Sequence, residues 1–182
     1  MNIFTINPDD TVLLIVDIQE KLASVVEDSE ALTSNTINLV ETAKLNNMPI
    51  VVTEQYPKGI GSTVKELKDA LKGIEICEKM TFSACGIKNF CEEKLHKRPK
   101  VLLCGIETHI CVLQTALDLL NSGYVVHVVS DCVSSRRGYN KDVGLRFMHD
   151  AGAVITTAET AIFQILKQAG TENFKAISKR MK

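Results

Sequence analysis

Residues 101–112 of the chain read Val-Leu-Leu-Cys-Gly-Ile-Glu-Thr-His-Ile-Cys-Val. An apolar run, a turn with a glycine and an apolar-periodic segment over residues 112–120 are typical of a strand, a short connection and a helix. Cys111 then lies in the first helical turn, where free N–H groups and the helix dipole favour a lowered thiol pKa and a reactive thiolate. Thr108 is the predicted N-cap. Cys111 could equally pack as a small apolar side chain, and this stretch alone leaves both interpretations open.

The composition of the chain is that of one soluble globular domain, which we assign to residues 1–182. Hydrophobic residues make up 45% of the chain, charged residues make up 24%, and the net charge is −1. Because the lysines and arginines are scattered, this balance gives no nucleic-acid-binding footprint. The apolar runs are far shorter than the ~20 residues that cross a bilayer, and the first ten residues do not read as a secretory signal. We therefore expect a cytoplasmic protein that has a small-molecule substrate and binds neither nucleic acid nor membrane.

The cysteines form no recognisable metal or disulfide pattern. There are six of them: Cys77, Cys85, Cys91, Cys104, Cys111 and Cys132. None forms a Cys-x-x-Cys pair, and no group of cysteines and histidines has zinc-ligand spacing. Without a secretory signal, we expect reduced thiols and not a disulfide framework.

Apolar runs alternate with helical patterns along the whole chain. The predicted strands are residues 11–17, 48–53, 74–79, 100–104, 124–130 and 153–156. The predicted helical segments are residues 19–26, 28–47, 64–71, 87–95, 108–121, 140–150, 157–168 and 172–182, and residues 54–61 read as a loop. Strands that alternate with helices in this way predict an α/β fold with a six-stranded parallel sheet and helices on both faces.

Three reactive residue types are predicted at one edge of this sheet. Asp17 ends the first strand, Lys79 ends the third, and Cys111 follows the fourth, and ligands bind at the carboxyl ends of parallel strands. A cysteine must lose its proton to attack, an aspartate can take that proton, and a lysine can stabilise the charges involved. The backbone N–H groups of Glu107 and Cys111 are candidates for an oxyanion hole. Each residue also has a simpler interpretation: the aspartate as a helix cap, and the lysine as a solvated surface residue.

At this point the sequence resembles the isochorismatase-like cysteine hydrolases. The matching segments are Leu-Ile-Val-Asp-Ile-Gln at residues 14–19, Glu-Lys-Met-Thr-Phe-Ser-Ala at residues 78–84 and Gly-Ile-Glu-Thr-His-Ile-Cys-Val at residues 105–112. The resemblance runs from about residue 7 to residue 167, with the motifs in the family's order. It implies a three-layer α/β/α fold, a catalytic triad of Asp17, Lys79 and Cys111, a cis peptide between Ile106 and Glu107, and a homo-oligomer. It also implies hydrolysis of carboxamides through a thioester.

The resemblance also narrows the range of reactions that we expect this protein to catalyse. Nicotinamidase-like members carry a metal site of an aspartate and histidines after the second strand, but residues 53–59 (Thr-Glu-Gln-Tyr-Pro-Lys-Gly) contain no histidine. We therefore predict no catalytic metal and no cofactor. True isochorismatases hydrolyse a vinyl ether, and some lack the cysteine, so Cys111 favours acyl chemistry on a C–N bond. The alternatives that stay open are vinyl-ether hydrolysis and a non-catalytic member that binds a metabolite or a protein.

The remaining predictions concern the surroundings of the site. The predicted pocket residues are Gln19, Tyr56, Phe82 and His109, although His109 could simply be an exposed side chain of the first helical turn. The pair Arg136 and Arg137 reads as a solvated turn or an interface element. Residues 113–120 or 162–166 could supply an apolar helix face for oligomerisation, or these residues could pack into the core.

Overall fold

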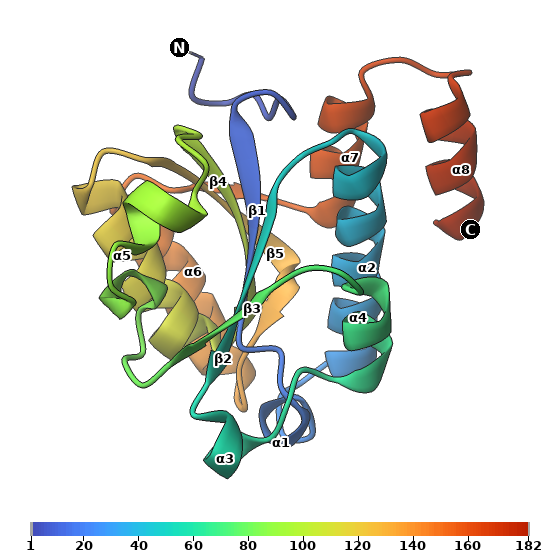
Figure 1. The fold of residues 1–182 in the computed structure, drawn as a ribbon. Coiled ribbons are helices and arrows are strands. Elements are labelled where there is room, and N and C mark those ends of the chain that lie inside the picture. Colours follow the sequence, from blue (N-terminus) through green and yellow to red (C-terminus); the bar gives the residue numbers. More distant parts are fainter. Residues whose placement is uncertain (1, 182) are drawn as a thin grey trace.

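The near-continuous apolar runs form a six-stranded sheet in the computed structural model, which describes residues 2–181 (Figure 1). The strands are β1 (Thr11–Val16), β2 (Ile50–Gln55), β3 (Ile76–Lys79), β4 (Lys100–Ile106), β5 (Val125–Ser134) and β6 (Val154–Thr156). Their spatial order is β3-β2-β1-β4-β5-β6, and every neighbouring pair is parallel. The predicted α/β fold with a six-stranded parallel sheet is confirmed.

Helices cover both faces of the sheet. They are α1 (Glu20–Ala23), α2 (Ser29–Leu45), α3 (Pro57–Ile60), α4 (Lys65–Ala70), α5 (Leu113–Asn121), α6 (Gly138–Asp150), α7 (Ala158–Leu166) and α8 (Glu172–Arg180). Helices α2, α4, α7 and α8 lie on one face, and α5 and α6 lie on the other (Figure 1). Strand β1 is buried on both faces, since Leu13 and Ile15 pack into one core cluster and Leu14 and Val16 into the other. This double burial explains why β1 is apolar without alternation.

Several element boundaries differ from the predicted ones. Strand β5 continues to Ser134 and β4 continues to Ile106, because after a register shift between Leu103 and Gly105 the two strands pair again, Gly105 with Val133 and Ile106 with Ser134. The first residues of the predicted loop 54–61 complete β2, and α3 follows. The predicted helix 87–95 is only a π-helical turn, Phe90–Lys94, preceded by Asn89 in a left-handed conformation that interrupts any longer helix.

The strand order changes direction between β1 and β4, and this switch point prepares a site. Ligands bind at such a point, outside the carboxyl ends of the strands. Gly105, near the end of β4, has φ +142°, and a Cβ atom there would lie 2.2 Å from the Val16 carbonyl oxygen. Only glycine lets β4 approach the end of β1 this closely. The fold therefore places the turn after β4 directly beside Asp17.

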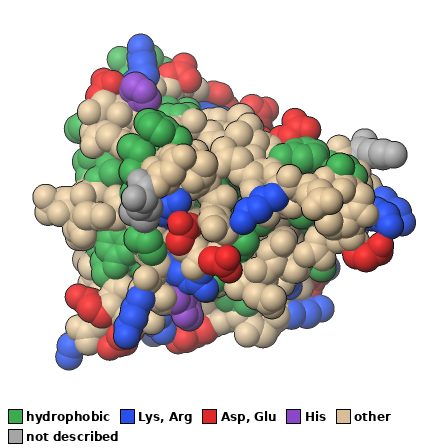
Figure 2. All heavy atoms as spheres, turned by 90° about the horizontal axis from the view of Figure 1, so that it is seen from above, with side chains coloured by type: hydrophobic (Ala, Val, Ile, Leu, Met, Phe, Trp, Pro, Cys, Tyr) green, Lys and Arg blue, Asp and Glu red, His purple; other side chains and the backbone are tan. Residues whose placement is uncertain are grey.

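The opposite edge of the sheet faces the viewer in Figure 2, and it carries acidic and basic side chains interspersed without a continuous patch of one sign. Within residues 2–181, no helix is both long and apolar enough to span a bilayer.

Candidate active site

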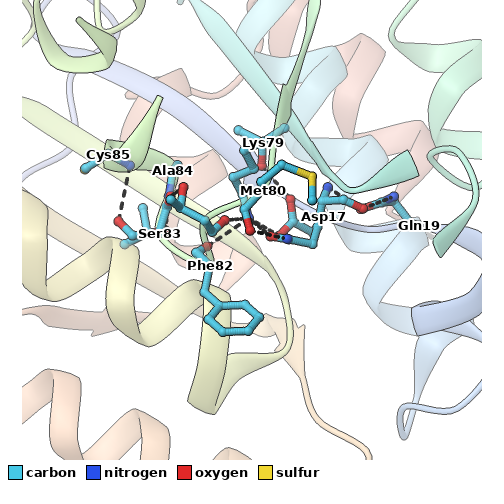
Figure 3. Close-up of polar contacts among 12 residues, drawn as sticks. Asp17, Gln19, Lys79, Met80, Phe82, Ser83, Ala84 and Cys85 are labelled. Carbon is cyan, nitrogen blue, oxygen red and sulfur yellow. Dashed lines mark hydrogen bonds and ion pairs between the residues drawn. The ribbon is translucent and has the colours of Figure 1, made fainter. Parts of the chain in front are cut away.

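Asp17 lies at the end of β1 and is fully buried, with 0% of its surface exposed. Its Oδ1 accepts a hydrogen bond from Thr53 Oγ1 at 2.7 Å, and its Oδ2 accepts one from Lys79 Nζ at 2.6 Å (Figure 3). Burial raises the pKa of the Asp17 carboxyl, and the charge and hydrogen bond of Lys79 act against this rise. The carboxylate is therefore held by two donors, and none of its surface is open to bulk solvent.

Lys79 is buried to the same degree, with 1% of its side chain exposed. Besides Asp17, its ammonium group donates to Gln55 Oε1 at 2.7 Å and to the Phe82 carbonyl at 2.8 Å, with Thr81 O at 3.2 Å. A buried charge is tolerated only when it is paired and hydrogen-bonded, and Lys79 meets both conditions. The end of β2 and the loop after β3 thus fix the ammonium group beside Asp17.

Cys111 lies in the π-helical turn Thr108–Val112 that leads into α5, and 5% of it is exposed. Burial, followed by the charge of Asp17, raises the pKa of Cys111 from 9.0 to about 12, and Lys79 lowers it only in part. The prediction that the helix start lowers the pKa of the Cys111 thiol is therefore wrong. At neutral pH the thiol keeps its proton, and the Asp17 carboxylate is the neighbouring group that can accept it.

The start of the turn also differs from the prediction. Glu107, not Thr108, occupies the N-cap position, and the hydroxyl oxygen of Thr108 is buried without a hydrogen-bond partner within residues 2–181. Gly144 of α6 lets that helix lie against Thr108 and His109, and the Thr108 side chain is fully buried. The carbonyl oxygen of Glu107 accepts hydrogen bonds from Ile110 N at 3.0 Å and Val112 N at 3.3 Å, which closes the turn.

The peptide bond between Ile106 and Glu107 is cis. The backbone N–H of Glu107 makes no loop or cap hydrogen bond within the described residues, so it is free to serve a ligand. The Glu107 carboxylate accepts hydrogen bonds from Arg136 N at 2.9 Å and from Arg136 Nε at 3.1 Å. Although 58% of the Arg136 side chain is exposed, the residue fixes Glu107, a role that neither the predicted solvated turn nor the predicted interface element included.

The predicted pocket residues fall into three groups. Gln19 is fully buried, and its amide bonds to both backbone groups of Gln55 and to Gly61 O, so it shapes the loop after β2 from within. His109 is half-buried, and its two ring nitrogens contact Ser135 Oγ at 3.0 Å and Asn140 Nδ2 at 3.3 Å. Tyr56 and Phe82 are exposed, and the Phe82 ring points away from the Asp17–Lys79 pair in Figure 3.

Two residues of the site escaped the sequence reasoning. Thr53 and Gln55 lie at the end of β2 and bind Asp17 and Lys79. The rule that placed Asp17 and Lys79 at the carboxyl edge of the sheet applies to β2 as well, so the signal was present. Gln55 falls in the predicted loop 54–61, and this boundary error concealed it, whereas Thr53 is the last residue of the predicted strand 48–53, so the rule already pointed to it.

A comparison with known protein families identifies the family of this chain. The isochorismatase domain profile matches residues 11–160. The chain belongs to the isochorismatase family. This confirms the resemblance drawn from the three motifs, and it gives the chain the α/β fold of a family whose members are generally hydrolases.

Individual relatives cover nearly the full length. The chain is 43% identical to the secreted isochorismatase effector Isc1 of Phytophthora sojae, over 96% of this chain and 86% of that protein. It is 37% identical to isochorismatase domain-containing protein 2 of Rattus norvegicus, over 96% and 82% respectively. Among solved structures, MAR1 ribonuclease from Caenorhabditis elegans has a TM-score of 0.91 and 39% identity, covering 97% of this chain and 92% of that one. The name of the Phytophthora protein describes a secreted effector, and the name of the Caenorhabditis protein describes a ribonuclease.

Proposed function

We propose that this isochorismatase-family protein is a cysteine hydrolase that cleaves the C–N bond of a small amide. The observation that carries the proposal is the buried ion pair of Lys79 and Asp17 beside Cys111. The Asp17 carboxylate is close enough to Cys111 to raise the pKa of its thiol. Cysteine, aspartate and lysine together supply a nucleophile, a general base and a charge stabiliser. No cofactor takes part in the proposed chemistry.

The proposed reaction begins with a protonated thiol. Asp17 takes the Cys111 proton while the sulfur attacks the carbonyl carbon, and the oxyanion of the tetrahedral adduct accepts hydrogen bonds from the backbone N–H groups of Glu107 and Cys111. The C–N bond then breaks, and Asp17 passes its proton to the leaving amine. A thioester on Cys111 remains.

Water completes the cycle. Asp17 removes a proton from a water molecule that attacks the thioester, and the carboxylic acid leaves as Asp17 returns the proton to the sulfur. Lys79 keeps its charge throughout and stabilises the carboxylate form of Asp17. The exposed Tyr56 and Phe82, together with the half-buried His109, are the proposed substrate contacts, with Gln19 supporting the loop behind Tyr56.

A substrate panel tests the proposal. Purified protein is incubated with small carboxamides and esters, and the release of ammonia or acid is followed, with Cys111→Ala as the blank and Cys77→Ser as the matched control. We expect turnover of at least one amide by the unmodified protein and by Cys77→Ser, and none by Cys111→Ala. Full activity in Cys111→Ala would contradict the assignment of the nucleophile. Isochorismate belongs in the panel because it tests the vinyl-ether alternative directly.

RNA is a second candidate substrate, because a relative with 39% identity is named a ribonuclease. A labelled single-stranded RNA therefore joins the panel. Cleavage that persists in Cys111→Ala would assign that activity to a different site from the one described above.

We also propose a homo-oligomer, as the family resemblance implied. Residues 113–120 and 162–166 turn most of their apolar side chains toward the core, but α6 exposes Tyr139, Val143 and Phe147 at a spacing of four residues. That spacing puts the three side chains on one face of the helix. Light scattering should give a mass above that of one 20.1 kDa chain, and Phe147→Glu should reduce it. A monomeric mass for the unmodified protein would overturn this proposal.

The cytoplasmic location likewise stays a proposal, to be tested by microscopy of a tagged chain.

A further inference from the structure

Two cysteines that take no part in the proposed reaction face one surface cavity. Cys85 and Cys91 are both free and half-buried, and both line a cavity of about 330 Å³ on the side of the sheet covered by α5. Phe90 and Tyr124 form part of its wall. Small solutes can therefore reach both thiols from the same side.

The backbone brings the two thiols together. Ile87 N donates to Ala84 O at 3.1 Å and Phe90 N donates to Ile87 O at 3.1 Å, so two successive turns reverse the chain between the cysteines. The Tyr124 hydroxyl donates to the Cys91 carbonyl at 3.4 Å and holds the far end. Burial is the main reason that the pKa of each thiol is raised, to about 12 for Cys85, and each thiol is also close enough to shift the pKa of the other.

The cavity adjoins the segment that positions Lys79. Cys85 N donates to Ser83 Oγ at 3.2 Å, and Ala84 N donates to Thr115 Oγ1 of α5 at 3.0 Å (Figure 3). Two residues earlier, the Phe82 carbonyl accepts a hydrogen bond from Lys79. Cys85 is therefore hydrogen-bonded to Ser83, which directly follows Phe82 in the loop around the ammonium group.

We propose that Cys85 and Cys91 form a dithiol modification site, which a small-molecule disulfide oxidises to an intramolecular disulfide. The thiolate of one cysteine attacks the small disulfide, which forms a mixed disulfide and releases one small thiolate. The thiolate of the other cysteine then attacks the protein sulfur and releases the second. Two protein thiols are oxidised, one disulfide is reduced to two thiols, and the two protein protons pass to the departing thiolates. Because thiolates are the reacting species, the reaction accelerates as pH rises.

We expect oxidation to be selective for Cys85 and Cys91, because the other cysteines are buried or lie outside the cavity. Cys104 and Cys132 are fully buried, and Cys111 is nearly so. Cys77 is half-buried like the pair, but it lies on β3, outside the cavity, and so it supplies the matched control.

The test uses oxidised glutathione with the full chain at mildly alkaline pH, followed by peptide mapping without reduction. We expect a peptide pair linked through Cys85 and Cys91, an intact mass lower by two hydrogen atoms, and reversal by dithiothreitol. Cys85→Ser and Cys91→Ser should each stop at a glutathione adduct on the remaining cysteine, whereas Cys77→Ser should form the disulfide as the unmodified chain does. Stable glutathione adducts on both cysteines of the unmodified chain, a disulfide between two chains, or unreacted thiols at both positions would each overturn the proposal.

Discussion

Replacing Asp17 by Asn should make Cys111 react faster with alkylating agents and should at the same time abolish turnover. The carboxylate is the second-largest cause of the raised pKa of Cys111, after burial. Without it, the thiolate loses a repulsive neighbour and keeps the attraction of Lys79. Turnover should nevertheless be lost, because the general base is gone. Alkylation of Cys111 should become faster while catalysis stops.

The size of the effect follows from the charge interaction. Two unit charges about 4 Å apart interact by about 4 kcal/mol at an effective dielectric constant near 20. This corresponds to at most about a thousandfold change in the thiolate fraction. A thiolate of lower pKa is also a weaker nucleophile, with a Brønsted slope of about 0.5, so about half of the logarithmic gain remains. We therefore expect Cys111 to alkylate roughly 10- to 30-fold faster in Asp17→Asn.

The assay follows iodoacetamide labelling at pH 8 by peptide mass spectrometry, which separates Cys111 from the other five cysteines. Asp131→Asn is the matched control, since its charge acts on Cys104 and not on Cys111. In the unmodified protein, Cys111 should react more slowly than a free thiol. Labelling of Cys111 in Asp17→Asn that is no faster than in the unmodified protein would refute the reasoning.

Three further predictions concern stability. Gly105→Ala should lower the free energy of unfolding by roughly 2–4 kcal/mol, because the new Cβ meets the Val16 carbonyl and the positive φ is strained, as chemical denaturation will show. Lys79→Met should cost about 3–5 kcal/mol by leaving Asp17 buried without its partner, and adding Asp17→Asn should recover part of that loss in a double-mutant cycle. The pKa of Cys111 is higher in the folded protein than in the unfolded chain. The contribution of the Cys111 thiol to the free energy of unfolding is therefore complete below pH 9.0 and is lost as pH rises toward 12. The stability of Cys111→Ala should therefore fall less steeply over that interval, by up to about 4 kcal/mol, and parallel curves would contradict the raised pKa.

The residues that strand ends bring together could be predicted from sequence. Asp17 and Lys79 lie in separate strands, yet parallel pairing puts both at one edge, and the apolar runs locate those strands. The contact between Glu107 and Arg136 could not be predicted in this way. The two residues are 29 positions apart, and they meet only because β5 continues beyond its apolar part to Ser134. No local pattern marks that continuation, since it depends on pairing with β4.

The protonation state of Cys111 was the other unpredictable property, and the reason is quantitative. A position at a helix start lowers a thiol pKa through an interaction of about 0.3–1 kcal/mol, up to ~2 kcal/mol in the best geometries. The rise from 9.0 to about 12 that burial and Asp17 produce corresponds to about 4 kcal/mol. Sequence shows the smaller effect and hides the larger one, because desolvation depends on what packs around the sulfur. The consequence for the proposed chemistry is that the nucleophile rests as a thiol, protected from solutes, and ionises only when a bound substrate lets its proton move to Asp17.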